Sequence, residues 1–313
     1  MVLEAASAAF LRAAGAEGRP PIHQSTPDEV RAASDPSLFG IGPTMHRVID
    51  TVAEAGDGGQ VPVRLLIPSA SPRATVVYFH GGGWVLGDLE SYDTLGRKLA
   101  AAADATVVMV GYRLAPEHPF PAALDDAWVA LRWTAAQCGR TTGIAGPLVV
   151  AGDSAGGNLA LGVARRAREA GPDVAASLLV YPVADVDTTR PSYVHPDNQL
   201  LVSKATMTWF LEHYLQGADG SQADVSPLND ADLSGLPPTA VALAEHDPLL
   251  DEGQELVTRL RASGVPVAAR LFEGQMHGFF QLTNVLAASD TAVGWLVEFL
   301  DGRIAPAHQG SRS

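Results

Sequence analysis

Six apolar runs of strand length, separated by stretches with helical spacing, constrain the fold of this chain more than any other feature. The runs are mostly continuous instead of alternating with polar residues, which is typical of parallel strands buried on both faces of a sheet. The expected strands cover residues 75–79, 106–110, 148–151, 177–181, 239–244 and 265–272. The expected helices cover residues 95–103, 122–133, 155–170, 252–262 and 285–300. Alternating strands and helices of this kind indicate an α/β doubly wound sheet.

Two parts of the chain depart from this alternation. The N-terminal part contains an expected amphipathic helix over residues 2–14, an irregular Pro-rich connection over residues 20–43, and two extended segments that flank the hairpin signal GDGG at positions 56–59. Residues 185–236 contain one strong helical stretch, 204–216, where a simple crossover needs far fewer residues. We therefore expect a single α/β domain over residues 1–313, with a helical cap built from residues 1–44 and 185–236.

Charge and composition exclude several classes of partner. The chain has 21 Lys and Arg residues against 35 Asp and Glu residues, so its formal net charge of −14 repels nucleic acids and anionic lipids. The single cysteine, Cys138, permits neither an internal disulfide nor a metal site built from cysteines. No apolar run reaches the roughly 18 residues of a membrane span, and Glu4 interrupts the only stretch that resembles a signal core. We expect no nucleic-acid partner, no membrane contact, no metal and a cytoplasmic location.

The sequence GDSAG at positions 152–156 directly follows one expected strand and directly precedes an expected helix. A G-x-S-x-G sequence between a strand and a helix is typical of a nucleophilic serine on a sharp turn. A sharp turn from strand to helix leaves no room for a Cβ atom at either glycine, and it lifts the serine hydroxyl above the edge of the sheet. Ser154 is therefore a candidate nucleophile. A glycine-rich turn with a capping serine is the alternative interpretation of the pentapeptide alone.

A serine nucleophile needs a histidine base and a carboxylate that orients it, which follow the serine in the order Ser, Asp/Glu, His in a sheet of this kind. Two downstream histidines lie in the long insertion and one in the polar C-terminal tail, which leaves His246 and His277. His277 is the better candidate, because it follows the last expected strand in a loop that can reach over the sheet edge. His246 is adjacent in sequence to Asp247, and neighbouring side chains do not easily face each other.

Three aspartates compete for the role of the orienting acid. Asp247 follows the expected strand 239–244, at its carboxyl end. Asp251 resembles an N-cap for the helix that begins at Glu252, which is the commoner use of aspartate before a helix. Asp185 follows an earlier strand, where this fold can also place an acid. The position at a strand end favours Asp247.

Backbone donors for a developing oxyanion are expected in the sequence HGGGW at positions 80–84, which follows the strand 75–79. Three glycines allow bare N–H groups to approach the reacting oxygen without obstruction by side chains. A phosphate-binding loop is not indicated, since no Gly-Lys-Ser/Thr follows and no G-x-G-x-x-G register fits. The N–H groups of Gly82, Gly83 and Ala155 are predicted to form an oxyanion hole.

Together these motifs resemble the bacterial hormone-sensitive-lipase-like carboxylesterases of the α/β-hydrolase fold. The resemblance spans roughly residues 45–300 and rests on HGGGW from position 80, YRLAPEHPFPA from 112, GDSAGG from 152, DPL from 247 and HGF from 277. It implies a mostly parallel central sheet flanked by helices, with a helical cap and no cofactor. For the site residues it implies Ser154 as nucleophile, His277 as base, Asp247 as orienting acid, and Gly82, Gly83 and Ala155 as oxyanion donors.

Four aromatic residues are candidates for substrate contact. Trp84 and Phe279 flank predicted catalytic positions, and Trp209 and Phe210 lie on the expected helix of the insertion. For each of them, packing in the protein interior is the alternative role. The last expected strand, 265–272, is a candidate sheet edge, and its apolar character favours pairing with a second copy in a homodimer.

The function expected from these features is that of a serine carboxylesterase acting on small-molecule, short-chain acyl esters through an acyl-enzyme intermediate. The short acyl chain is implied by the resemblance. An amidase or a metabolite deacetylase with the same triad is the alternative among enzymes, and a small-molecule receptor on a hydrolase scaffold is the alternative outside them. No Ser-x-x-Lys, H-E-x-x-H or H-x-x-E-H sequence occurs, which excludes β-lactamase-type esterases and those metallohydrolase signatures.

Overall fold

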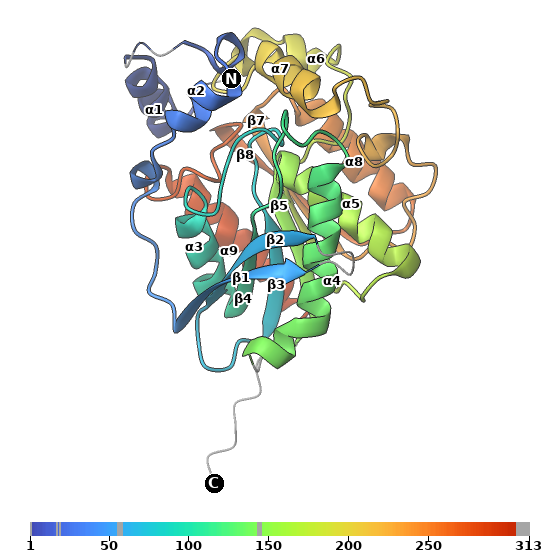
Figure 1. Ribbon diagram of the computed structural model, residues 1–313. Coiled ribbons are helices and arrows are strands. Elements are labelled where there is room, and N and C mark those ends of the chain that lie inside the picture. Colours follow the sequence, from blue (N-terminus) through green and yellow to red (C-terminus); the bar gives the residue numbers. More distant parts are fainter. Residues whose placement is uncertain (1, 17, 19, 55–58, 143–145, 305–313) are drawn as a thin grey trace.

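An eight-stranded sheet forms the centre of the computed structural model, which describes residues 2–16, 18, 20–54, 59–142 and 146–304 (Figure 1). Its strand order is β1-β2-β4-β3-β5-β6-β7-β8. The strands are β1 (Arg47–Glu54), β2 (Gln60–Ile67), β3 (Ala74–Phe79), β4 (Ala105–Val110), β5 (Leu148–Asp153), β6 (Ala176–Val180), β7 (Thr239–His246) and β8 (Val267–Met276). β2 is antiparallel to both of its neighbours, and the other pairs are parallel. The predicted mostly parallel sheet is confirmed.

Helices cover both faces of the sheet. α3 (Asp93–Ala103) and α9 (Ala287–Asp301) pack in one apolar cluster, and α4 (Ala122–Thr142), α5 (Ala155–Ala170) and α8 (Leu250–Ala262) pack in the other. Figure 1 shows the two groups on opposite sides of the strands. Every residue of β3, β4, β5 and β6 is buried, which explains why these strands read as continuous apolar runs.

Several strands run further toward their carboxyl ends than the sequence indicated. β5 continues to Asp153, β7 to His246 and β8 to Met276. In β5 the polar Asp153 remains paired, opposite Val180. The pairing of β7 with β8 becomes irregular after Ala244 and Phe272 and resumes with His246 opposite Met276, which apolar periodicity alone does not reveal. Each of the three strands therefore ends directly before a candidate catalytic residue, at one edge of the sheet.

The N-terminal residues and the insertion contain α1 (Ala5–Ala16), α2 (Pro27–Ala32), α6 (Pro191–Val194) and α7 (Lys204–Leu215), together with short 3-10 turns. Figure 1 shows these four helices grouped at one end of the molecule. The expectation that residues 20–43 are irregular was wrong for α2. Its start is fixed by a capping box, in which the Thr26 side chain accepts the N–H of Glu29 and the Glu29 carboxylate accepts the N–H of Thr26.

Two sequence predictions fall partly on residues that are not described. In the GDGG hairpin signal, residues 56–58 lie outside the described residues, but the strands on either side pair antiparallel with Glu54 opposite Gln60. Cys138 lies on α4, and its side chain lies outside the described ones. In the part of the chain that is described, no helix combines the length and apolarity needed to traverse a bilayer.

Candidate active site

Ser154 occupies the sharp turn between β5 and α5. Its φ of 55° and ψ of −121° are sparsely populated by residues other than glycine. Backbone hydrogen bonds hold this conformation: the Ser154 N–H donates to the Val180 carbonyl at 2.9 Å, and the Ser154 carbonyl accepts the N–H groups of Asn158 and Val183. The strained turn is thus fixed to the end of β6, and it directs the hydroxyl away from the ladder.

The glycines around Ser154 are required by close backbone contacts. A Cβ atom at Gly156 would lie 1.9 Å from the carbonyl oxygen of Phe79, and one at Gly152 would lie 2.2 Å from the carbonyl oxygen of Gly156. Real Cβ contacts are never this short, so no side chain fits at either position. The predicted lack of room is confirmed, and it arises because α5 begins directly against the end of β3.

The imidazole of His277 lies between Ser154 and Asp247. Nε2 is 2.9 Å from Oγ of Ser154, and Nδ1 is 2.8 Å from Oδ2 of Asp247. A carboxylate only accepts, so Nδ1 carries the proton and Nε2 is left to accept the serine hydroxyl proton. The other Asp247 oxygen accepts the N–H of Leu249 at 2.8 Å, which fixes the carboxylate. All three side chains are buried.

Among the described residues, none of the three competing side chains makes a hydrogen bond to Ser154 or His277. The Nε2 atom of His246 is buried, and among the described residues it has no hydrogen-bond partner. Asp251 accepts the N–H of Ser192 at 2.7 Å, and Asp185 pairs with Arg190. The expectation that Asp251 is an N-cap was wrong, because α8 begins at Leu250 and Asp251 lies in its first turn.

The loop that follows β3 contains three successive residues with positive φ, Gly82 (108°), Gly83 (60°) and Trp84 (59°). A Cβ atom at Gly82 would lie 2.3 Å from the carbonyl oxygen of Leu86, and one at Gly83 would lie 2.2 Å from the ring of Phe210. Within the described part of the chain, neither the Gly82 nor the Gly83 N–H makes a hydrogen bond. We call residues 81–87 the glycine loop.

A buried carboxylate, that of Asp153, connects the glycine loop to the serine turn. One oxygen accepts the Tyr78 hydroxyl (2.7 Å) and the Gly81 N–H (3.0 Å), and the other accepts the Tyr92 hydroxyl (3.1 Å). Burial raises the pKa of Asp153 to about 6, against the opposing effect of the tyrosine hydrogen bonds. The sequence did not reveal the two tyrosines that hold this carboxylate.

His80 precedes the glycine loop and is held by packing. Its ring stacks on Tyr112, with centroids 4.3 Å apart, and the Tyr112 hydroxyl donates to the His80 carbonyl at 2.7 Å. Burial lowers the pKa of His80 to about 4, so the ring is neutral at ordinary pH. Tyr112 is the first residue of the stretch YRLAPEHPFPA, and its contacts help to hold His80 in place.

The four aromatic candidates for substrate contact lie in different surroundings. Trp84 is fully buried and stacks on Tyr214 with a centroid distance of 4.1 Å, and Phe279 is fully buried in the α3/α9 cluster. Phe210 lies directly over Gly83. Trp209 is buried and packs against Phe210. Their contact with substrate remains a prediction.

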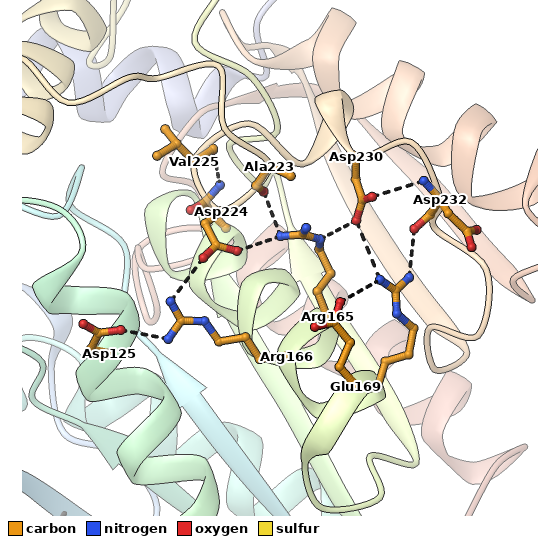
Figure 2. Close-up of polar contacts among 11 residues, drawn as sticks. Asp125, Arg165, Arg166, Glu169, Ala223, Asp224, Val225, Asp230 and Asp232 are labelled. Carbon is orange, nitrogen blue, oxygen red and sulfur yellow. Dashed lines mark hydrogen bonds and ion pairs between the residues drawn. The ribbon is translucent and has the colours of Figure 1, made fainter.

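Arginines on α5 tie the helix behind Ser154 to the insertion and to α4, as Figure 2 shows. Arg165 donates to Asp224 at 2.9 Å and to Asp230 at 2.7 Å, and Arg166 bridges Asp125 and Asp224. The Arg165 and Arg166 side chains are 12% and 25% exposed, and their charge-assisted hydrogen bonds connect α5 to the insertion and to α4. Among the described residues, no cluster of three or more His, Cys, Asp or Glu side chains is arranged to hold a metal ion.

Comparison with known proteins agrees with this geometry. A family model described as the alpha/beta hydrolase fold matches residues 76–281. The carboxylesterase NlhH of Mycobacterium tuberculosis is 40% identical over 241 residues, covering 75% of this chain and 76% of the relative. The ethyl acetate hydrolase of Pseudomonas putida is 35% identical over 291 residues, covering 90% and 91%. The hyperthermophilic esterase of Pyrobaculum calidifontis superposes with a TM-score of 0.90 at 34% identity, covering 96% and 99%.

The fold and these relatives define the class of protein: an α/β hydrolase with the architecture of an ester-cleaving enzyme. More narrowly, the chain belongs to the hormone-sensitive-lipase-like carboxylesterase family. The predictions of fold, family and ester hydrolase activity are therefore confirmed.

Proposed function

We propose that this chain hydrolyses small carboxylic esters through an acyl-enzyme intermediate on Ser154. The observation that carries this proposal is the continuous line of hydrogen bonds from Asp247 through His277 to Ser154, at 2.8 and 2.9 Å. It is the arrangement in which a serine hydroxyl can lose its proton while it attacks.

In the first half-reaction, Oγ of Ser154 forms a bond to the ester carbonyl carbon, and its proton passes to Nε2 of His277. The carbonyl oxygen becomes an oxyanion, which accepts the N–H groups of Gly82, Gly83 and Ala155 in this proposal. Each such donor is worth on the order of 3 kcal/mol to the transition state. When the intermediate collapses, the bond to the alcohol oxygen breaks, and the alcohol leaves with the proton from His277.

In the second half-reaction, water gives a proton to Nε2 of His277 and attacks the acyl carbon. A second oxyanion forms in the same place. Its collapse releases the carboxylic acid, and Oγ of Ser154 recovers the proton. Asp247 keeps the imidazole in the required tautomer and stabilises the imidazolium that forms twice in each cycle. No cofactor is needed for this chemistry.

Residues 1–44 and 185–236 are proposed to form the cap of this site. Both contribute contacts to catalytic loops: Phe210 lies over Gly83, Leu201 lies 3.7 Å from the position of a Cβ atom on Gly278, and Arg31 donates to the Val85 carbonyl at 2.9 Å. The Phe210 ring limits the space beside the glycine loop, which supports a preference for short acyl chains. The Pseudomonas relative, named for ethyl acetate, supports the same preference.

Kinetics of p-nitrophenyl acetate hydrolysis test the proposed roles. Ser154→Ala and His277→Gln should each lower kcat by about a thousandfold or more, while circular dichroism shows an intact fold. The rejected candidates supply matched controls: His246→Gln and Asp251→Asn should retain activity, in contrast to His277→Gln and Asp247→Asn. Turnover retained by Ser154→Ala would refute the mechanism, and a wild-type protein that binds but does not cleave esters would favour the receptor alternative.

A homodimer formed along β8 is proposed as the assembly, since β8 is an edge strand of the sheet. The cytoplasmic location stays a prediction from the sequence.

A further inference from the structure

Arg31, on α2, makes an unusual number of contacts for a residue of the N-terminal segment. Its Nε donates to the Val85 carbonyl at 2.9 Å, and its Nη2 donates to the Ala115 carbonyl at 2.6 Å. The guanidinium also donates to both carboxylate oxygens of Glu117, at 2.6 and 3.0 Å. The Arg31 side chain is 26% exposed, so these bonds form in a partly desolvated place.

The two carbonyls belong to segments that are already joined beside the proposed oxyanion hole. Val85 lies in the glycine loop, and its N–H donates to the Gly82 carbonyl at 3.1 Å. Ala115 lies in the stretch after β4, and its N–H donates to the carbonyl of Trp84 at 2.9 Å. Through these hydrogen bonds, Arg31 connects the late part of the glycine loop to the segment that follows β4.

The start of the same loop is held by a buried residue at the end of β5. There the buried carboxylate of Asp153 accepts the Gly81 N–H at 3.0 Å. Gly82 and Gly83, whose N–H groups are the proposed oxyanion donors, lie between Gly81, which Asp153 holds, and Val85, which Arg31 holds. Gly82 and Gly83 adopt positive φ at little cost, whereas Trp84 does so against its own preference, so contacts with other segments are needed to hold the backbone there.

We propose that Arg31 is a positioning residue for ester hydrolysis, which holds the glycine loop in the shape that directs the Gly82 and Gly83 N–H groups at the oxyanion. The proposal rests on the proposed function, since it assumes that these N–H groups stabilise that charge. Through Arg31, docking of α2 becomes a condition for full activity.

The chemistry of the guanidinium suits this role. Its planar fork reaches three separate acceptors at once, which the single ammonium of lysine does not. Glu117 holds the fork from the solvent side, and the hydrogen bonds from Arg31 lower the pKa of Glu117 to about 2, so the carboxylate stays charged at working pH. Because the Glu117 side chain is 50% exposed, its ion pair adds little to overall stability. The effect of Arg31 is therefore expected in catalysis more than in thermal stability.

The experiment compares Arg31→Gln, Arg31→Lys and Glu117→Gln with Arg73→Gln as a matched control. Arg73 also donates to a backbone carbonyl, that of Ala103, and to a carboxylate, that of Asp301, but it precedes β3 at the end away from the glycine loop. For each variant, kcat and KM are measured with p-nitrophenyl acetate. The inhibition constant of phenylboronic acid is measured as well, since its tetrahedral adduct with a serine places an oxygen where the oxyanion forms.

Arg31→Gln should lower kcat about tenfold and weaken phenylboronic acid by a similar factor, with KM changed less than about twofold, because small displacements of catalytic groups cost this much or more. Arg31→Lys should fall between Arg31→Gln and wild type, Glu117→Gln should lose less than Arg31→Gln, and Arg73→Gln should retain kcat. Unchanged kcat and boronate affinity in Arg31→Gln, or equal losses in Arg31→Gln and Arg73→Gln, would overturn the proposal. A wild-type protein without ester turnover would instead overturn the proposed function on which it rests.

Discussion

Asp153 and Gly81 lie so close together that a side chain at position 81 would collide with the Asp153 carboxylate. The Asp153 carboxylate accepts the Gly81 N–H at 3.0 Å, and a Cβ atom on Gly81 would lie 2.5 Å from Oδ2 of that carboxylate. The residue before the proposed nucleophile thus fixes the first glycine of the glycine loop. Together with the pairing of Phe79 opposite Gly152, this contact links the loop after β3 to the turn after β5.

The burial of Asp153 predicts a specific pH dependence of stability. Burial raises its pKa from 3.8 to about 6, so between these values the folded protein holds this proton more tightly than the unfolded chain does. The contribution of Asp153 to the free energy of unfolding therefore falls as pH rises from about 4 to about 6. At about 1.4 kcal/mol per pKa unit, the fall is of the order of 3 kcal/mol.

Asp153→Asn keeps an oxygen acceptor for Gly81 and Tyr78 but has no proton to lose. We expect the stability of this variant, relative to wild type, to increase by up to about 3 kcal/mol between pH 4 and pH 7. Urea unfolding of both proteins at the two pH values gives the difference, in which the effects of all other titrating groups cancel. A difference that is the same at both pH values would show that Asp153 does not change protonation in this range.

Two glycines in helices provide a direct comparison of the same substitution. Gly156→Ala would place a Cβ atom 1.9 Å from the Phe79 carbonyl, so the start of α5 and the serine turn must move. Gly294 lies exposed on α9 with no atom within 4 Å of its Cβ position. We expect Gly294→Ala to stabilise the protein by about 0.5–1 kcal/mol and Gly156→Ala to abolish ester turnover.

Thermal unfolding and p-nitrophenyl acetate kinetics on the two variants measure both effects. If Gly156→Ala retained normal activity, α5 would not be packed as tightly against β3 as the structure shows. If Gly294→Ala were destabilising, the solvent-exposed surroundings of that glycine would be in question.

The sequence was most informative where one physical requirement dominates a segment. Continuous apolar runs predicted the buried strands, because a strand covered on both faces has no polar positions. The glycines at 152 and 156 predicted the serine turn, since only a missing Cβ allows that approach. Even so, the triad geometry depends on strand ends that apolar patterns did not reach, such as Met276 at the end of β8.

The parts that the sequence did not reveal depend on contacts between distant segments. Arg31 and Val85 are 54 positions apart, and no local pattern connects them. Tyr78 read only as part of an apolar strand, yet its hydroxyl donates to Asp153. By contrast, Thr26 and Glu29 form a capping box for α2, which is a local signal that the sequence itself carries.

Phe210 offers a test of substrate size. Its ring lies directly over Gly83, so Phe210→Ala should open space beside the glycine loop. One extra methylene in a pocket changes kcat/KM by a factor of about 10 or more. In Phe210→Ala, the ratio of kcat/KM for p-nitrophenyl hexanoate to that for the acetate should therefore rise at least about tenfold. Leu211→Ala, one position further on α7 and also buried, is the control for loss of helix packing. An equal ratio in both variants would mean that Phe210 does not limit the acyl chain.

The proposed homodimer depends on how much of the outer edge of β8 is free to pair with a second copy. Glu4 donates its N–H to the Gly274 carbonyl, so α1 covers the late part of the strand, whereas Leu271, in its first half, is 40% exposed. In a dimer built along this edge, the same strand of both copies forms the interface, so Leu271→Lys places a charged side chain from each copy within it, and charges on an edge strand oppose pairing. Light scattering should then give a dimer for wild type and a monomer for Leu271→Lys.

Ile41→Lys, at a position 96% exposed elsewhere on the surface, should leave the dimer intact. A monomeric wild type, or a Leu271→Lys variant that remains dimeric, would exclude this edge as the interface.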